Sequence, residues 1–289
     1  MSRGKSIELF LVNGTADSLI TAELSNWNGK AIKIPRLEIS DCKRSDIEGA
    51  GVYFLFCKDD DGFESVYIGE SENVKTRLLQ HITDYNSGKE KYYWNWAVSF
   101  VGRDLNKALI RYLEDRLVQI ARSSNRFTVL TKNTHSNTVL KESQVAAMEE
   151  FIENVKILIN ALGYKVLEPL RQNDAGTSAD DEELHIEISD YEANGLITTE
   201  GFVLLAGATI SNDISTKSLN NGLIKQREKY ENSDAVEDRR DQGEKYRRTT
   251  QDILFSSSSA AADFVLGYSV SGPRTWKNKA GKSLKELDL

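Results

Sequence analysis

Two apolar runs that stand close together in the sequence constrain the fold of this chain most. Residues 51–57 (GVYFLFC) and 66–70 (VYIGE) are rich in β-branched and aromatic side chains, which favour strands. The segment between them contains the pair Asp61-Gly62, which is typical of a hairpin turn. Residues 72–82 follow at once and carry apolar side chains at the four-residue spacing of a helix. We therefore expect an antiparallel hairpin that leads directly into a helix.

The same periodicities place the other elements of the N-terminal half. We expect strands over residues 6–12, 31–38 and 95–101, and helices over residues 105–122 and 143–162. Ser71 and Asp104 precede helical patterns and are the expected N-cap residues of two helices. The strands nearest the N-terminus are expected to pack against the hairpin and its helix.

The second half of the chain begins with an acidic segment. Eight Asp and Glu residues and no Lys or Arg lie between residues 174 and 192, which is typical of a solvated linker, with a partner-binding tail as the alternative. After it we expect a strand over residues 201–211, a charged surface helix over 225–248, which includes KQREKY (225–230) and EDRRDQGEKYRR (237–248), and an apolar helix before a basic tail. The expected segments are a strand-rich extension (1–45), a first domain (46–135), a helical segment (136–171), the acidic linker (172–200) and a C-terminal domain (201–289).

Composition excludes several classes of protein. The formal net charge of −7 argues against a nucleic-acid coat protein, because phosphate affinity comes from Lys and Arg. Two cysteines and three histidines are too few for a structural zinc site or a disulfide framework, so a bound metal ion would need carboxylate ligands. No apolar run is long enough for a membrane helix, and the first residues do not resemble a signal peptide. We expect a cytoplasmic protein that does not bind membranes.

Four side chains are expected to meet where the hairpin enters its helix. In a hairpin closed near Asp60, Tyr53 and Tyr67 would sit opposite each other on one face of the sheet. Arg77 and His81 are four residues apart, so they share one face of the helix and can overhang the tyrosine pair. Two phenols would then share one site with a cation and an imidazole.

This order of residues resembles the signature of the GIY-YIG nuclease superfamily. GVY at 51–53 and YIG at 67–69 resemble its two tripeptides. Arg77, His81 and Glu114 stand where members of that superfamily place an arginine, a histidine and a metal-binding glutamate. The resemblance covers roughly residues 50–133.

The resemblance extends beyond the signature. Shorter motifs at 7–14, 26–36 and 276–284 are similar to a bacterial subfamily that joins a GIY-YIG domain to a domain of unknown function, DUF4357. Two departures stand inside the signature. Val52 replaces the usual isoleucine, which should be neutral in a core, and Glu70 places a negative charge beside a phosphate site.

The resemblance implies an α+β fold in which a small, mainly antiparallel GIY-YIG-type sheet is flanked by helices, with a small C-terminal α+β domain. It implies an endonuclease that hydrolyses phosphodiester bonds in DNA by tyrosine-assisted attack of water, with Mg²⁺ as cofactor and Mn²⁺ as a substitute. The implied catalytic residues are Tyr53, Tyr67, Arg77, His81 and Glu114, with Glu114 as the metal ligand, and the implied substrate-binding residues are Gly69, Lys75 and Asn133.

The implied roles leave one choice open. Arg77 would stabilise the developing negative charge, and Tyr67 would position the water or the phosphate. Tyr53 is the candidate general base, although a phenol with an ordinary pKa of about 10 must be shifted down to work near neutral pH. His81 is the other candidate base.

Each feature also has a structural explanation. Tyrosines in strands are common packing residues, and Glu114 alone could be an exposed partner of Arg111. The aromatic run at 92–96 could stack on bases or belong to the core, and we favour the core. The basic residues of the tail could hold a phosphate backbone or be solvated: Arg274, Lys277, Lys279, Lys282 and Lys285.

Two rival functions stand beside the nuclease. One is a DNA-binding module that keeps the fold without cutting, and the other is a protein-interaction module in which the site is vestigial. Cutting both strands of a duplex with one site per chain would suggest a homodimer.

Overall fold

The chain forms two compact units, Met1–Pro169 and Leu170–Leu289. The computed structural model describes residues 4–58, 62–134, 138–170, 183–188, 190–241 and 244–287. Asp61 of the expected turn, and residues 172–182 of the expected linker, lie outside these ranges. Each unit has a hydrophobic core of its own. Within the described ranges, no helix is long and apolar enough to cross a membrane.

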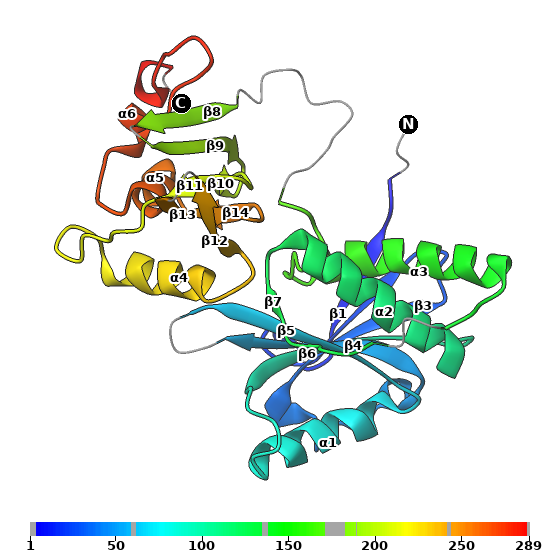
Figure 1. Ribbon diagram of the computed structural model, residues 1–289. Coiled ribbons are helices and arrows are strands. Elements are labelled where there is room, and N and C mark those ends of the chain that lie inside the picture. Colours follow the sequence, from blue (N-terminus) through cyan, green and yellow to red (C-terminus); the bar gives the residue numbers. More distant parts are fainter. Residues whose placement is uncertain are drawn as a thin grey trace. The chain divides into compact units, whose positions relative to one another are not determined.

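In the described part of the first unit, seven strands form one sheet (Figure 1). The strand order is β1-β2-β3-β6-β4-β5-β7, and all neighbouring pairs are antiparallel except β5 and β7. The bounds are β1 Ile7–Leu11, β2 Ile20–Leu24, β3 Gly29–Pro35, β4 Gly51–Lys58, β5 Glu64–Ser71, β6 Trp94–Gly102 and β7 Thr128–Val129. The expected mainly antiparallel sheet is confirmed.

Helices cover both faces of this sheet. As Figure 1 shows, α1 (Val74–Asn86) lies on one face, and α2 (Lys107–Ser124) and α3 (Glu142–Ala161) lie on the other. Short 3₁₀ turns at Arg36–Glu38 and Asp46–Glu48 connect β3 to β4. The expected arrangement of a sheet flanked by helices is therefore present.

Strand β4 contributes to both layers because successive side chains of a strand point to opposite faces. Val52 and Phe54 pack in the core beneath α2 and α3. Tyr53 and Leu55 pack on the other side, with residues of α1. Burial on both faces explains why the sequence of β4 is a continuous apolar run.

Both predicted N-caps are wrong. The side chain of Asn73 caps α1 by accepting a hydrogen bond from the backbone N–H of Thr76, whereas Ser71 ends β5. The side chain of Asn106 caps α2, whereas Asp104 accepts a hydrogen bond from Asn28 at 3.0 Å. Asparagine caps a helix as well as serine or aspartate does, so sequence preference alone could not choose between neighbouring candidates.

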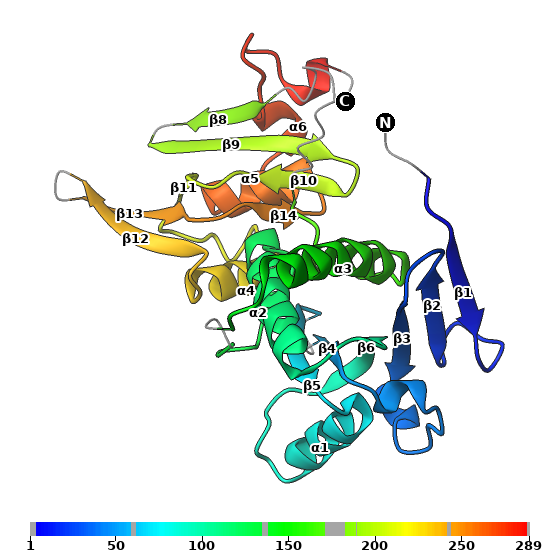
Figure 2. The same cartoon turned by 90° about the vertical axis from the view of Figure 1, so that its right-hand side faces the viewer.

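The N-terminal strands extend the same sheet. Figure 2 shows β1, β2 and β3 side by side at one end of it. β3 pairs with β6 from Gly29↔Gly102 to Pro35↔Trp96, which joins the N-terminal residues to the hairpin sheet. The sequence did not predict β2, because its five residues lie between two turn-rich segments and include the polar Thr21 and Glu23.

The second unit contains two smaller sheets. The strand orders are β14-β10-β9-β8 and β11-β13-β12. The bounds are β8 Leu184–Ile188, β9 Tyr191–Thr198, β10 Gly201–Leu204, β11 Thr209–Ile210, β12 Val236–Asp241, β13 Glu244–Thr249, β14 Ile253–Phe255, α4 Asn221–Glu231, α5 Ser258–Leu266 and α6 Gly272–Thr275. Trp276, Phe202 and Phe264 are buried at its centre, and this arrangement is the expected α+β fold.

The structure corrects two predictions in this unit. The expected linker at 172–200 is wrong from residue 184 onward, because β8 and β9 pair there and bury Leu184 and Ile186. The helix expected over 225–248 is present at 225–230, which lies in α4, but it is wrong over 237–248, because β12 and β13 form an antiparallel pair there. Glu237 lies opposite Arg248 and Asp238 lies opposite Arg247 across that pair, so these charged residues have partners on the neighbouring strand.

Candidate active site

Tyr53 and Tyr67 lie on the same face of the sheet, but they are not opposite each other. Tyr53 pairs with Gly69, and Tyr67 pairs with Leu55. The predicted register is wrong because the hairpin closes between Lys58 and Glu64, which centres it on residue 61 and not on residue 60. The two phenol rings are diagonal neighbours with centroids 6.3 Å apart, so both reach one site.

Gly69 makes room for Tyr53. A Cβ atom on Gly69 would stand 2.5 Å from the Tyr53 Oη and 2.9 Å from Cε1 of Tyr67. Carbon atoms do not approach other atoms this closely, so any side chain at this position would displace the ring of Tyr53. The third residue of the YIG tripeptide therefore has a steric reason to be glycine.

Helix α1 brings Arg77 and His81 onto the tyrosine pair. The hydroxyl of Tyr53 lies 2.9 Å from Nε2 of His81, and the imidazole packs edge-on against Tyr67 with centroids 5.1 Å apart. The guanidinium of Arg77 acts on both hydroxyls as a nearby charge and as a hydrogen-bond donor. The four residues that the sequence placed together are therefore together.

The other nitrogen of His81 contacts a residue that the sequence did not identify. Nδ1 of His81 lies 2.6 Å from Oε1 of Glu90, in the loop after α1. An ionised carboxylate can only accept, so beside an ionised Glu90 the neutral ring carries its proton on Nδ1, and Nε2 accepts the hydrogen bond of the Tyr53 hydroxyl. Burial, together with the charges of Arg77 and Arg36, lowers the pKa of His81 to about 3, so the resting ring is neutral.

Glu114 approaches the phenols from the other layer of the fold. It lies on α2 and is 6% exposed, although most glutamates on helices are solvated. β7 pairs with β5 only at Ser65 and Val66, and the Thr131 side chain bonds both backbone groups of Ile68. Among the described residues, no further strand pairs with the Gly69 end of β5, so this end is an edge of the sheet. The charge of Glu114 raises the pKa of both phenols there.

Burial dominates the acidity of Tyr53. It raises the pKa of the Tyr53 phenol well above 10, and the neighbouring Tyr67 raises it further. Arg77 lowers this pKa and Glu114 raises it, and neither reverses the effect of burial. The downward shift of the Tyr53 pKa that a general base needs near neutral pH is therefore absent in the protein alone. Tyr53 is protonated at rest, and its proton can leave through the hydrogen bond to His81.

The comparison with protein families identifies both units. Residues 49–127 match the model of the GIY-YIG catalytic domain. Residues 184–288 match the model of a domain of unknown function, DUF4357. The chain joins a GIY-YIG domain to a DUF4357 domain. No curated protein and no solved structure matches it.

The GIY-YIG domain has a nuclease-type fold. The negative charge of Glu70, which departs from the usual signature, is paired with cations of α2. The Glu70 carboxylate accepts two hydrogen bonds from Nζ of Lys107, at 2.7 and 2.8 Å, and Arg111 lies 3.9 Å away. The side chain of Glu70 points to α2, because it alternates with Gly69 along β5. Its negative charge is therefore neutralised by α2 and does not face the phenols.

The three residues implied in substrate binding lie around the cluster. Lys75, in the first turn of α1, forms an ion pair with Glu48 at 3.1 Å. Asn133 is exposed, two residues beyond Thr131 at the edge of β5. Gly69 lies under the ring of Tyr53. Contact of these residues with substrate stays a prediction.

The donor set of the GIY-YIG domain suits a magnesium ion held by one carboxylate. Among the described residues, no group of three or more His, Cys, Asp or Glu could hold a metal ion. Mg²⁺ is commonly bound by one or two carboxylates, with waters and substrate phosphate oxygens completing its shell. Glu114 is a buried carboxylate whose charge acts on both phenols, so it would offer an oxygen ligand of this kind beside them.

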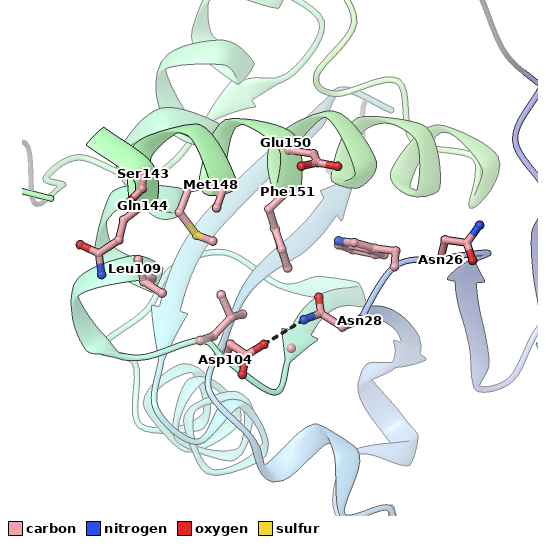
Figure 3. Close-up of a pocket in the computed structure, with 13 residues that line it drawn as sticks. Asn26, Asn28, Asp104, Leu109, Ser143, Gln144, Met148, Glu150 and Phe151 are labelled. Carbon is pink, nitrogen blue, oxygen red and sulfur yellow. Dashed lines mark hydrogen bonds between the residues drawn. The ribbon is translucent and has the colours of Figure 1, made fainter. Parts of the chain in front are cut away.

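A separate pocket of the first unit lies away from the phenols. Figure 3 shows a pocket of about 550 Å³ beneath α3, which contains the hydrogen-bonded pair Asn28 and Asp104. Apolar side chains such as Met148 and Phe151 line it, and the charged residues of its described lining are Asp104 and Glu150. Two acids and no cation make this pocket unsuited to a phosphate, whereas Arg77 stands at the phenol cluster.

The remaining sequence candidates separate by burial. In the aromatic run, Trp94 is fully buried and Tyr93 is 42% exposed, so the core interpretation holds for Trp94. Trp276 is also buried, and its indole N–H donates to the carbonyl of Ser258 at 2.8 Å. The five basic residues of the tail are exposed: Arg274, Lys277, Lys279, Lys282 and Lys285. Exposure is compatible with both interpretations of the tail.

Proposed function

We propose that the GIY-YIG domain of this chain is a Mg²⁺-dependent endonuclease that hydrolyses phosphodiester bonds in DNA. The observation that carries the proposal is the hydrogen bond of 2.9 Å between Tyr53 and the neutral His81. The charges of Arg77 and Glu114 both act on the Tyr53 phenol of this pair. Hydrolysis of a phosphodiester needs a base for the attacking water and positive charge for the phosphate oxygens. This cluster offers both.

In this proposal Tyr53 and His81 act together as the base. The Tyr53 oxygen takes the proton of the water that attacks phosphorus, while the proton of the phenol moves to Nε2 of His81. This coupling resolves the choice left open by the sequence, because the buried phenol never has to release its proton to solvent. Tyr67 lies beside both groups and would orient the water or the phosphate.

Positive charge would come from two sources. Arg77 reaches both phenols and would bind the non-bridging phosphate oxygens as charge develops on them. When bound, a magnesium ion held by Glu114 would supply Lewis-acid charge to the phosphate and the departing oxygen.

A plasmid cleavage assay tests the proposal. Supercoiled DNA is incubated with Mg²⁺ or Mn²⁺ and with wild type, Tyr53→Phe or Glu114→Gln. Each variant should lose about 10²–10⁴-fold in rate, the range for removal of an acid or base group. Tyr164→Phe and Glu149→Gln serve as matched controls and should cut normally, because Tyr164 stacks on Phe56 in the other core and Glu149 pairs with Arg116.

The same assay separates the rivals. Metal-dependent cleavage that survives in Tyr53→Phe and Glu114→Gln would exclude this site. A wild-type protein that binds the plasmid without cutting it would favour a binding module on the same fold. The same conclusion would follow if branched DNA or RNA, tested in place of the plasmid, were bound but not cut.

A further inference from the structure

Both ring nitrogens of His81 are engaged, and each contact has a different partner. Nε2 faces Tyr53 at 2.9 Å, and Nδ1 faces Glu90 at 2.6 Å. His81 is fully buried, and its ring is also packed against Tyr53 and Tyr67. The ring therefore cannot turn to exchange its two nitrogens without losing both hydrogen bonds.

The backbone fixes Glu90 in this position. The N–H groups of Lys89 and Glu90 both donate to the carbonyl of Asp84 in the last turn of α1. Glu90 thus folds back along the helix that carries His81. Its side chain is 15% exposed, but the carboxylate oxygen that does not face His81, Oε2, is buried, so all three members of the Tyr53, His81 and Glu90 chain are largely shielded from solvent.

The charge of a buried arginine, Arg36, acts on Glu90 from outside residues 49–127, which match the GIY-YIG model. Arg36 follows β3 and is 6% exposed, with its guanidinium 4.6 Å from the ring of Tyr93 and 4.8 Å from that of Trp94. Burial raises the pKa of Glu90 above its ordinary value, and the charges of Arg77 and Arg36 oppose this shift by favouring the ionised carboxylate. Neither Arg36 nor Glu90 carried a sequence signal that linked it to the tyrosines.

We propose that Glu90 is the positioning residue of a Tyr53–His81–Glu90 proton relay. This inference rests on the proposed function for the reaction that the relay serves. Glu90 holds His81 in the tautomer whose Nε2 lone pair faces Tyr53, and its negative charge stabilises the imidazolium that forms. The logic is that of a base oriented by a carboxylate, as in the hydrolase triads.

The protons balance over the step. The O–H bond of the attacking water breaks as a new O–H bond forms on Tyr53, and the original phenol proton forms an N–H bond at Nε2. Tyr53 is thereby regenerated, and His81 holds one additional proton. The departing 3′ oxygen takes a proton from solvent, and His81 later releases its proton to solvent, so the protons balance over the cycle.

The need for a carboxylate follows from the surrounding charges. Arg77 and Arg36 both disfavour a positive ring at His81. Among the described residues, Glu90 is the anion that contacts this ring directly. Without its charge the imidazolium would stand against two cations in a buried site, so the proton transfer from Tyr53 would become unfavourable.

A direct test reads the tautomer of His81 in the full-length protein, without using catalysis. The chain has three histidines, so ¹⁵N-histidine labelling gives a simple spectrum in which the His81→Gln variant assigns His81. At pH 7 the wild type should show a protonated Nδ1 and an unprotonated Nε2. Glu90→Ala should lose this preference. A wild-type His81 protonated at Nε2, or a tautomer unchanged in Glu90→Ala, would overturn the proposal.

Kinetics then test the role of the charge. Glu90→Gln keeps the shape and removes the charge, so kcat should fall by about 10²–10⁴-fold while KM stays close to that of wild type. Glu90→Asp should restore part of kcat. Glu153→Gln, an exposed carboxylate paired with Lys156, is the control and should leave both constants unchanged. Equal kcat in Glu90→Gln and wild type would contradict the proposal.

The two readouts separate the two proposals. A wild-type protein that shows the Glu90-dependent tautomer but cuts no nucleic acid would support the Glu90–His81 pairing and reject the proposed function. Cleavage that depends on Tyr53 and Glu114 but not on Glu90 would reject the relay alone. Melting temperatures of all variants show whether a lost signal reflects unfolding.

Discussion

The space above Gly69 is occupied by the ring of Tyr53, and this single contact links the two tripeptides of the signature. Tyr53 comes from the first tripeptide and Gly69 from the second, and they are direct partners across β4 and β5. The ring can lie flat over β5 because no Cβ stands in its way. The glycine therefore determines where the Tyr53 hydroxyl lies relative to His81 and Arg77.

Replacing this glycine tests that role. Gly69→Ala should move the Tyr53 ring and reduce cleavage by about 10²-fold, since a displacement of about 1 Å costs that much at a catalytic group. Overpacking should also cost about 1–3 kcal/mol of stability, measured by urea denaturation. Gly102→Ala in β6 is the control, because its Cβ would make only ordinary contact with Leu105 at 3.4 Å. Full activity in Gly69→Ala would show that the ring does not need this space.

The buried His81 predicts a dependence of stability on pH. Its pKa is about 3 in the folded protein and about 6.5 when unfolded, so the unfolded chain binds a proton that the folded chain does not. The contribution of the neutral His81 to the free energy of unfolding is complete above pH 6.5 and is lost as the pH falls toward 3. Between pH 7.5 and pH 5.0 the loss should be about 2 kcal/mol. Urea denaturation of wild type and His81→Gln at both pH values measures it, and an equal loss in both proteins would contradict the buried neutral imidazole.

The sequence predicted much of the candidate site but not its details. Tyr53, Tyr67, Arg77 and His81 could be grouped because strand and helix periods place them on facing surfaces. The register was wrong by two residues, because Tyr53 pairs with Gly69 and not with Tyr67, and this shift keeps the tyrosines on one face but makes them diagonal neighbours. Glu90 could not be predicted, because its contact depends on the path of a loop and not on any period.

At the scale of elements, α2 carries Glu114 and depends on an asparagine cap. The side chain of Asn106 accepts hydrogen bonds from the backbone N–H groups of Ala108 and Leu109. Asn106→Ala should cost about 1 kcal/mol of unfolding free energy, the usual value for a lost N-cap. Asp104→Ala removes only the exposed bond to Asn28 and should change stability by less than about 0.5 kcal/mol. Chemical denaturation of both variants measures these losses. A larger loss of stability in Asp104→Ala than in Asn106→Ala would show that Asp104 is the N-cap, as expected from the sequence.

Elements were predicted best where one period dominates. α3 was expected over residues 143–162 and spans Glu142–Ala161, because its apolar residues repeat regularly against the sheet. The hairpin of β12 and β13 was missed, because charged residues that pair across strands have no apolar period to reveal them. β8 and β9 were missed for a related reason: their acidic side chains lie on the exposed face and concealed the buried Leu184 and Ile186.

At the scale of the molecule, the residues of the proposed site all belong to one unit. The cores around β4, both helical layers and the loop that carries Glu90 lie within Met1–Pro169. A protein of residues 1–169 should therefore unfold in one cooperative transition by calorimetry and cleave with the kcat of the full chain. Any change should appear in KM, which would measure what the DUF4357 unit adds to substrate binding. Loss of kcat in a folded fragment would show that residues 170–289 complete the site.

The central claim is that Tyr53 and Glu114 serve one hydrolytic step. The most direct test is the single-turnover rate of plasmid cleavage with Mg²⁺ for wild type, Tyr53→Phe, Glu114→Gln and the double variant. Residues that act as one unit are non-additive, so the double variant should be no slower than the slower single variant. Single variants that cut at the wild-type rate, or losses that multiply in the double variant, would contradict the account.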